Sequence, residues 1–182
     1  LAQEASTSKE QILPNWVSIT ERAQTLILEH QGLRLGIVIF PSKPDRNAEG
    51  KETGEFRSRA ESIEQAVASL QESCDLIMGI SNWGWQLERR FLADQKTPVS
   101  ILFGSGSGPA VRGKRAASGQ TYWVRPYSRG RALTSLSIAH SETKPWIDGW
   151  DQGQDIRSDI LVLDEKIETD PQMEKLLLSV QR

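Results

Sequence analysis

Cysteine and histidine are scarce in this sequence of 182 residues, which contains only Cys74, His30 and His140. A single cysteine excludes an internal disulfide and any zinc site built from several cysteines. Neither histidine belongs to a recognisable motif, so we expect both to have surface or hydrogen-bonding roles. No Ser–His–Asp triad can be assembled from the sequence pattern. The scarcity of these residues therefore leaves few of the common catalytic centres available.

The sequence also lacks a long apolar run and a strong net charge. Its longest apolar run, around residues 35–40, is far too short to span a bilayer. The net charge of −2 gives no general attraction to nucleic acid or to an anionic membrane. No signal peptide is visible, and the start at Leu1 rather than methionine predicts that an upstream part was removed. The length fits one domain.

Hydrophobic periodicity predicts an α/β order in the first part of the chain. Strands are expected at residues 23–28, 33–40, 74–80 and 99–103. Helices are expected at residues 57–72 and 85–93, where apolar side chains recur at helical spacing. The strands at 35–40 and 76–80 are apolar throughout, which suits strands that are covered on both faces. The order predicts a layered sheet with helices packed on it.

The pattern changes in the second part of the chain. Further strands are expected at residues 122–124, 133–139 and 160–163, with no helices between them. Asp170 and Pro171 then read as a helix N-cap and the first helical position. We therefore divide the chain into an N-terminal arm (1–22), a main α/β domain (23–168) and a C-terminal connector helix (169–182).

Three segments carry a resemblance to a known family. Residues 74–84 (CDLIMGISNWG) look like the family segment "DLIIxLSHLG", and residues 101–107 (ILFGSGS) look like "ILGGHSH". Residues 122–124 followed by 128–133 look like "VVQAGSYGRYLG". In order and spacing these segments resemble the C-terminal part of a calcineurin-like metallophosphoesterase domain of the 5′-nucleotidase family. The similarity covers roughly residues 33–182, and the Asp170-Pro171 helix resembles the connector to that family's second domain.

The resemblance implies a metal site that has lost its ligands. In the family, two metal ions bound by Asp, His and Asn activate a water and clamp the phosphate. Here the histidine of the "SH" motif falls on Asn82, and the two histidines of "GHSH" fall on Ser105 and Ser107. The upstream Asp-x-His and "GNHE" motifs are absent. The resemblance thus implies an incomplete metallophosphoesterase-like layered sheet without a metal ion or another cofactor.

The glycine-rich segment at residues 104–108 offers a different interpretation, a nucleotide or anion site. Its candidate residues are Gly104, Gly106, Gly108, Arg129 and Arg131. A dinucleotide-binding turn needs a helix directly after the glycines, whereas a proline and a basic, helix-poor stretch follow here. A phosphate-binding loop that starts at residue 108 would need serine or threonine at residue 115, where arginine stands. We therefore favour a flexible turn at the end of a strand.

Tryptophan is abundant, with six residues. Trp83 and Trp85 flank Gly84 where the active-site loop of an enzyme would lie, and Trp146 and Trp150 flank a second glycine. Exposed tryptophans mark interfaces and sugar platforms, whereas buried ones fill the core or cover a sheet edge. Both interpretations stay open, and we name these four tryptophans as candidate interface residues.

The sequence as a whole favours a non-catalytic metallophosphoesterase-like module with a structural or interaction role. Such a module would belong to a larger exported protein or assembly, in the periplasm or outside the cell. One alternative is a fragment of a 5′-nucleotidase-like phosphohydrolase, and another is a nucleotide- or anion-binding module. We expect the partner to be the remainder of the precursor, another subunit or a second copy, with no nucleic acid and no membrane span.

Overall fold

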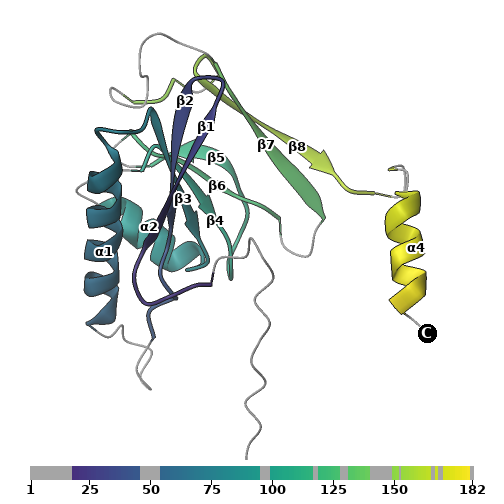
Figure 1. The fold of residues 1–182 in the computed structure, drawn as a ribbon, viewed down its shortest axis with the longest axis horizontal. Coiled ribbons are helices and arrows are strands. Elements are labelled where there is room, and N and C mark those ends of the chain that lie inside the picture. The colour runs from purple at the N-terminus through teal and green to yellow at the C-terminus, as the bar shows by residue number, and fades with distance from the viewer. Residues whose placement is uncertain are drawn as a thin grey trace, which may run out of the picture.

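A mixed β-sheet with helices on one face forms the body of the protein in this computed structural model (Figure 1). The structure describes residues 18–45, 54–94, 99–116, 119–127, 131–139, 149–151, 153–164, 167 and 170–180. The main sheet has six strands in the order β1-β2-β3-β4-β6-β5. They are β1 (Gln24–His30), β2 (Leu33–Ile39), β3 (Leu76–Ser81), β4 (Ile101–Gly104), β5 (Val111–Arg115) and β6 (Tyr122–Arg125).

The central strands β2, β3, β4 and β6 run parallel, and the edge strands β1 and β5 run antiparallel to their neighbours. The β1–β2 hairpin turns at Gln31 and Gly32, which both have positive φ angles, 51° and 80°. A two-residue turn with this left-handed backbone matches the twist of the strands that it joins. The strands predicted on either side of this turn are confirmed, and β1 extends to His30.

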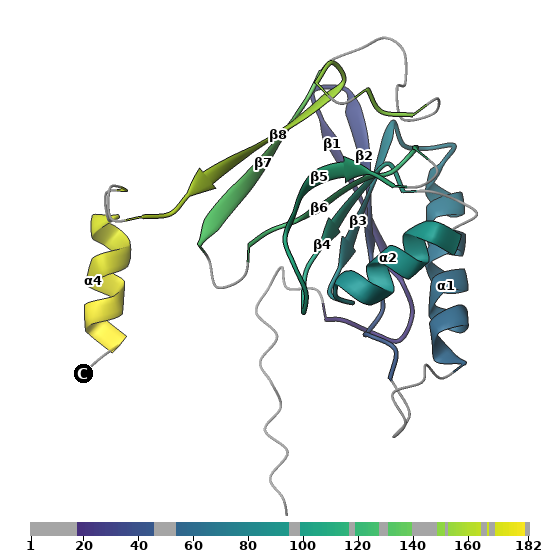
Figure 2. The ribbon, with the colours of Figure 1, turned by 180° about the vertical axis from the view of Figure 1, so that it is seen from behind.

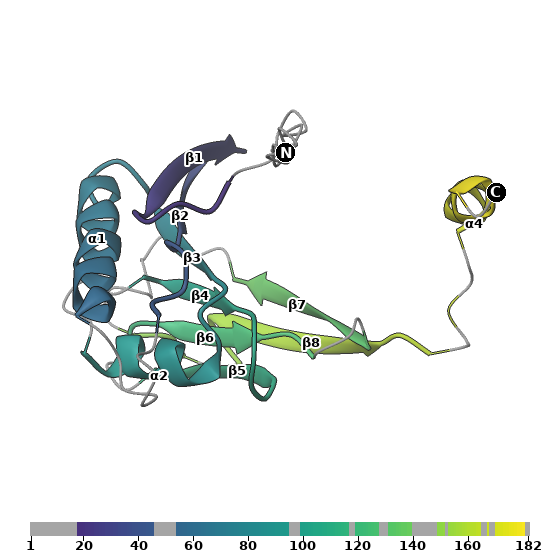
Figure 3. The same cartoon turned by 90° about the horizontal axis from the view of Figure 1, so that it is seen from below.

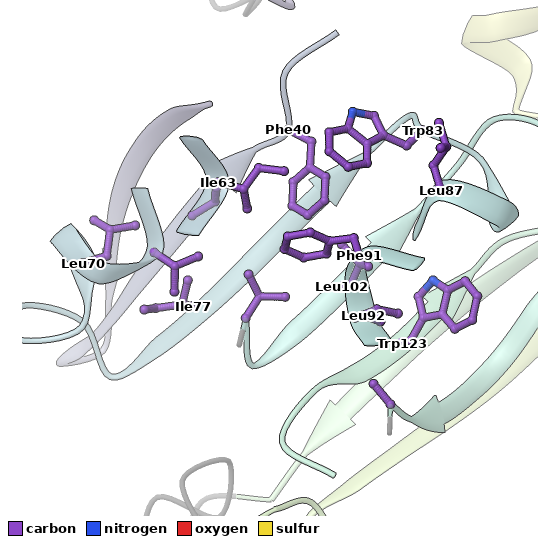
Figure 4. Packing of buried hydrophobic residues seen from close by; sticks show 14 of the residues in the cluster. Phe40, Ile63, Leu70, Ile77, Trp83, Leu87, Phe91, Leu92, Leu102 and Trp123 are labelled. Atoms are coloured by element: carbon purple, nitrogen blue, oxygen red, sulfur yellow. The ribbon is translucent and has the colours of Figure 1, made fainter. Parts of the chain in front are cut away.

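Two helices cover one face of the sheet, as Figure 2 shows from behind. They are α1 (Glu55–Leu70) and α2 (Trp85–Asp94), each within two residues of its predicted bounds. Figure 4 shows their apolar side chains meeting those of the strands. At the centre of the core between these helices and the sheet, the rings of Phe40, Trp83 and Phe91 pack edge to face, with centroids 5.1 to 6.1 Å apart. The predicted layering of helices on a mixed α/β sheet is therefore present.

A two-stranded hairpin lies against the other face of the main sheet, which Figure 3 shows edge-on. It consists of β7 (Ala132–Ile138) and β8 (Ile156–Val162), which pair antiparallel. Trp150 is fully buried beneath it with Tyr122 and Ile101, and donates its indole N–H to the backbone oxygen of Ser100 at 2.8 Å. The hairpin therefore closes a second, smaller core over β4 and β6.

The helix α4 (Pro171–Val180) begins where the sequence predicts. Asp170 Oδ1 accepts hydrogen bonds from the backbone N–H groups of Gln172 at 2.8 Å and Met173 at 3.2 Å, which confirms the N-cap. Figures 1, 2 and 3 agree in placing α4 away from the main sheet. Within the described residues, no helix is long and apolar enough to cross a membrane.

Two elements depart from the sequence expectation. Strand β5 was not predicted, because it has one large apolar residue, Val111, and pairs with β6 through its backbone. Strand β8 begins at Ile156, four residues before its predicted start. The candidate residues Arg129, His140 and Trp146 lie outside the described residues, as does most of the predicted N-terminal arm.

Candidate functional site

The loops that follow β3 and β4 are joined by hydrogen bonds at the carboxyl ends of these strands. The backbone N–H of Gly84 donates to Ser105 O at 3.0 Å, and that of Trp85 donates to Ser107 O at 2.8 Å. The hydroxyl of Ser105 donates to Ser81 O at 2.8 Å. The two loops therefore form one interlocked unit, at the place where the resemblance would put a metal site.

The three positions at which the resemblance implies lost metal ligands, Asn82, Ser105 and Ser107, belong to these two adjoining loops. A side chain added at Gly106 would meet the backbone oxygen of Asn82 at 2.7 Å, which shows how closely the loops approach. The amide oxygen Oδ1 of Asn82 is buried and has no hydrogen-bond partner. Among the residues that the structure describes, no three His, Cys, Asp or Glu side chains gather into a metal-binding group. The donors in these loops are thus one amide and two hydroxyls.

A buried ion pair lies beside the loops. Arg125 Nη1, at the end of β6, donates to Glu88 Oε2 of α2, and the two side chains are 2% and 0% exposed. Glu88 Oε2 also accepts the indole N–H of Trp123 at 3.1 Å, and Oε1 accepts the backbone N–H of Ser105 at 3.2 Å. The carboxylate is therefore fully engaged by one cation and two neutral donors.

The guanidinium of Arg125 also binds four backbone carbonyls of the loop after β4. Its donors reach the oxygens of Ser105 at 3.0 Å, Gly106 at 3.1 Å, Ser107 at 3.2 Å and Pro109 at 3.1 Å. A guanidinium has five N–H donors in a rigid fork and no acceptor, so it matches a ring of carbonyls and one carboxylate. Arg125 thereby fixes the path of residues 105–109 from inside the protein.

This arrangement bears on the candidate anion site at Gly104, Gly106 and Gly108. An anion-binding turn presents N–H groups to its ligand. Here the carbonyls of residues 105–107 turn toward a guanidinium instead. Gly104 lies against the ion pair, because a side chain added there would meet Glu88 Oε2 at 2.0 Å. Arg131, the one candidate arginine that the structure describes, is exposed at the start of β7. The carbonyls of the loop after β4 therefore bind the guanidinium of Arg125.

The candidate interface tryptophans divide between core and surface. Trp83 is 1% exposed and donates its indole N–H to Pro41 O at 2.8 Å, and Trp150 is 0% exposed. Their assignment to an interface is therefore corrected: both side chains fill the two cores. Trp85 is half-buried, with the guanidinium of Arg89 stacked 4.6 Å from its ring centroid.

Sequence reasoning did not predict that Glu88, Trp123 and Arg125 form a buried cluster. One signal for Glu88 was present, because it precedes Phe91 by three residues and Leu92 by four, which places all three on the inward face of one helix. A carboxylate on that face requires a buried partner, since glutamate is almost never fully buried unless it is paired.

A second feature of the molecule is an apolar face of the main sheet that the described residues leave partly uncovered. By alternation and register, Leu26 and Leu28 of β1 share this face with Leu35 and Ile37 of β2 and with Ile80 of β3. Leu26, Leu28 and Ile80 are 45%, 44% and 46% exposed. The hairpin of β7 and β8 buries the face over β4 and β6. The uncovered sheet face therefore lies over β1, β2 and the end of β3.

The fold and this site define the chain as a mixed α/β protein with a charged cluster sealed at the strand ends. Its sequence matches no model of a protein family and no curated protein.

Proposed function

We propose that this chain is a non-catalytic α/β module that acts through protein contacts, and that its fold derives from the C-terminal part of a metallophosphoesterase domain of the 5′-nucleotidase type. The observation that carries the proposal is the buried pair of Glu88 and Arg125. Ligands of open α/β sheets bind outside the carboxyl ends of the strands. At that place, Arg125 and Glu88 bind only groups of this chain in the contacts described above.

The donor set at the strand ends supports the absence of phosphoesterase chemistry. A two-metal mechanism lowers the pKa of a bound water and neutralises the charge of the phosphate. Asn82, Ser105 and Ser107 offer neutral oxygens, and the hydroxyl of Ser105 is already bonded to the backbone of β3. Without an ion, water keeps its bulk pKa of about 15.7 and is a poor nucleophile at neutral pH.

The uncovered sheet face supports the interaction role. Soluble monomers rarely expose a contiguous apolar patch larger than a few hundred Å². On this face Leu26, Leu28 and Ile80 are 45%, 44% and 46% exposed, and by register they share it with apolar side chains of β2. The occupant is a protein surface: the rest of a precursor, another subunit or a second copy. The resemblance also supports an exported location.

The proposal is tested by assaying hydrolysis of nucleoside monophosphates and a generic phosphoester, with zinc or manganese added, and by elemental analysis after dialysis. We expect background hydrolysis and well under one metal ion per chain. The matched control is Asn82→Ala, because Asn82 is the one former ligand position with an unbonded buried oxygen. Turnover that persists through purification and disappears in Asn82→Ala would show that the site is catalytic.

A further inference from the structure

Strand β1 lies at an edge of the main sheet, and within the described residues it has few of the features that usually protect an edge. Leu26, Ile27 and Leu28 are 45%, 42% and 44% exposed, so the centre of the strand exposes apolar side chains on both faces. Natural edges are commonly blocked by proline, lysine, a bulge or a covering element. The seven residues of β1, QTLILEH, contain neither proline nor lysine, and their register with β2 is unbroken. An edge of this kind favours pairing with another strand.

The hairpin determines which backbone groups of β1 face the open edge. The β-turn between His30 and Leu33 makes them a hydrogen-bonded pair. Such pairs alternate along an antiparallel ladder, so every second residue of β1 turns its N–H and C=O toward β2. The residues between them, Thr25, Ile27 and Glu29, therefore direct their N–H and C=O away from β2.

We propose that β1 pairs antiparallel with β1 of a second copy, about a two-fold axis that passes through Ile27. Ile27 then lies opposite Ile27 of the second copy, and each outward-facing residue meets an outward-facing residue, as an antiparallel ladder requires. The other opposed pairs are Leu26 with Leu28, Thr25 with Glu29 and Gln24 with His30. The apolar residues thus meet at the centre, and no like charges are opposed.

The neighbouring symmetric registers are worse. A two-fold at Glu29 would place two carboxylates opposite each other, which destabilises a strand pair. A two-fold at Thr25 would place Ile27 opposite Ala23, and Leu28 opposite Arg22. A two-fold at Leu26 would place Ile27 opposite Thr25 and Leu28 opposite Gln24, and a two-fold at Leu28 would place Ile27 opposite Glu29 and Leu26 opposite His30. Each of these two registers therefore opposes fewer apolar residues to each other than the register about Ile27. The strand is therefore most self-complementary in the register about Ile27, which argues for a second copy as the occupant of the edge.

This inference rests on the proposed function only in taking the β1 end of the sheet as a contact surface. Its first test is the mass of the purified chain by sedimentation or light scattering at high micromolar concentration. We expect a dimer, about twice the chain mass of 20.4 kDa. Ile27→Lys places charges of the same sign opposite each other and should raise the Kd at least about tenfold. Leu161→Lys is the matched control, because Leu161 of β8 is 56% exposed and lies away from β1.

The second test fixes the register with cysteines. Thr25 lies opposite Glu29 of the second copy, where the Cα atoms are about 5.5 Å apart and a disulfide fits. Two copies of Thr25 are four residues apart along the ladder, roughly 14 Å, which is too far for a disulfide. A mixture of Thr25→Cys and Glu29→Cys chains should therefore form mixed disulfides under mild oxidation much faster than either variant alone.

The pairing is overturned if the parent chain is a monomer. It is also overturned if the parent chain is a dimer whose Kd is the same in Ile27→Lys as in Leu161→Lys. Equal cross-linking of each single variant and the mixture overturns it as well. These failures differ from failure of the proposed function, which appears as metal-dependent turnover lost in Asn82→Ala.

Discussion

Removing the cation of the buried ion pair gives the sharpest test of the strand-end cluster. Arg125→Met keeps an unbranched side chain of similar reach but deletes every donor of the guanidinium. Glu88 then remains buried with only the indole of Trp123 and the backbone N–H of Ser105. The carbonyls that Arg125 binds also lose their partner. We expect both losses to destabilise the fold and to loosen residues 105–109.

The expected cost of Arg125→Met follows from the burial of the pair. Deleting one partner of a buried ion pair typically costs about 3–5 kcal/mol, because the other charge is left uncompensated. With a urea m-value of about 2 kcal/mol/M, a loss of about 4 kcal/mol lowers the midpoint of unfolding by about 2 M. A natural domain is stable by only about 5–15 kcal/mol, so this loss is a large fraction of the total.

Urea unfolding followed by tryptophan fluorescence measures this cost, with Arg57→Met as the matched control. Arg57 pairs with Glu61 at 3.1 Å on the surface of α1, where the side chains are 85% and 57% exposed. An exposed pair of this spacing contributes about 0.3–0.5 kcal/mol. The double variant with Glu88→Gln should cost less than the sum of the single variants, because it leaves no unpaired charge. A cost of Arg125→Met as small as that of Arg57→Met would refute the reasoning.

Two further predictions concern backbone positions. Gly104→Ala should destabilise the protein by about 1–3 kcal/mol, because the added methyl meets Glu88 Oε2 at 2.0 Å. Gly54→Ala, where nothing lies within 4 Å, is its control in the same urea titration, and equal midpoints would contradict the close packing. Asp170→Ala should weaken the start of α4 by about 1 kcal/mol. Faster hydrogen exchange of the two amides that Asp170 caps checks this, and unchanged exchange would show that the cap is dispensable.

Local patterns in the sequence were sufficient to predict most elements, but not how they are covered. The apolar run at residues 35–40 predicts a strand covered on both faces. In the structure Val38 is 0% exposed under α1, whereas Ile37 and Ile39 on the opposite face are half-buried. An apolar run reports that both faces of a strand are apolar. It does not report whether the described chain supplies a layer for each face, because that depends on tertiary arrangement.

At the site, too, local sequence patterns predict single elements but not the contacts between residues that are distant in the sequence. The resemblance grouped Asn82, Ser105 and Ser107 from the sequence, and in the structure they lie on neighbouring loops because the strands before them are parallel neighbours whose carboxyl ends meet. The pairing of Glu88 with Arg125 joins residues 37 apart, and no local pattern identifies the partner. The helical spacing of Glu88 nevertheless limits the possibilities. A carboxylate on the inward face of α2 is costly to bury unless a cation lies within reach. Glutamate at that position therefore predicts a buried cation on a facing strand, and the last residue of β6 is Arg125.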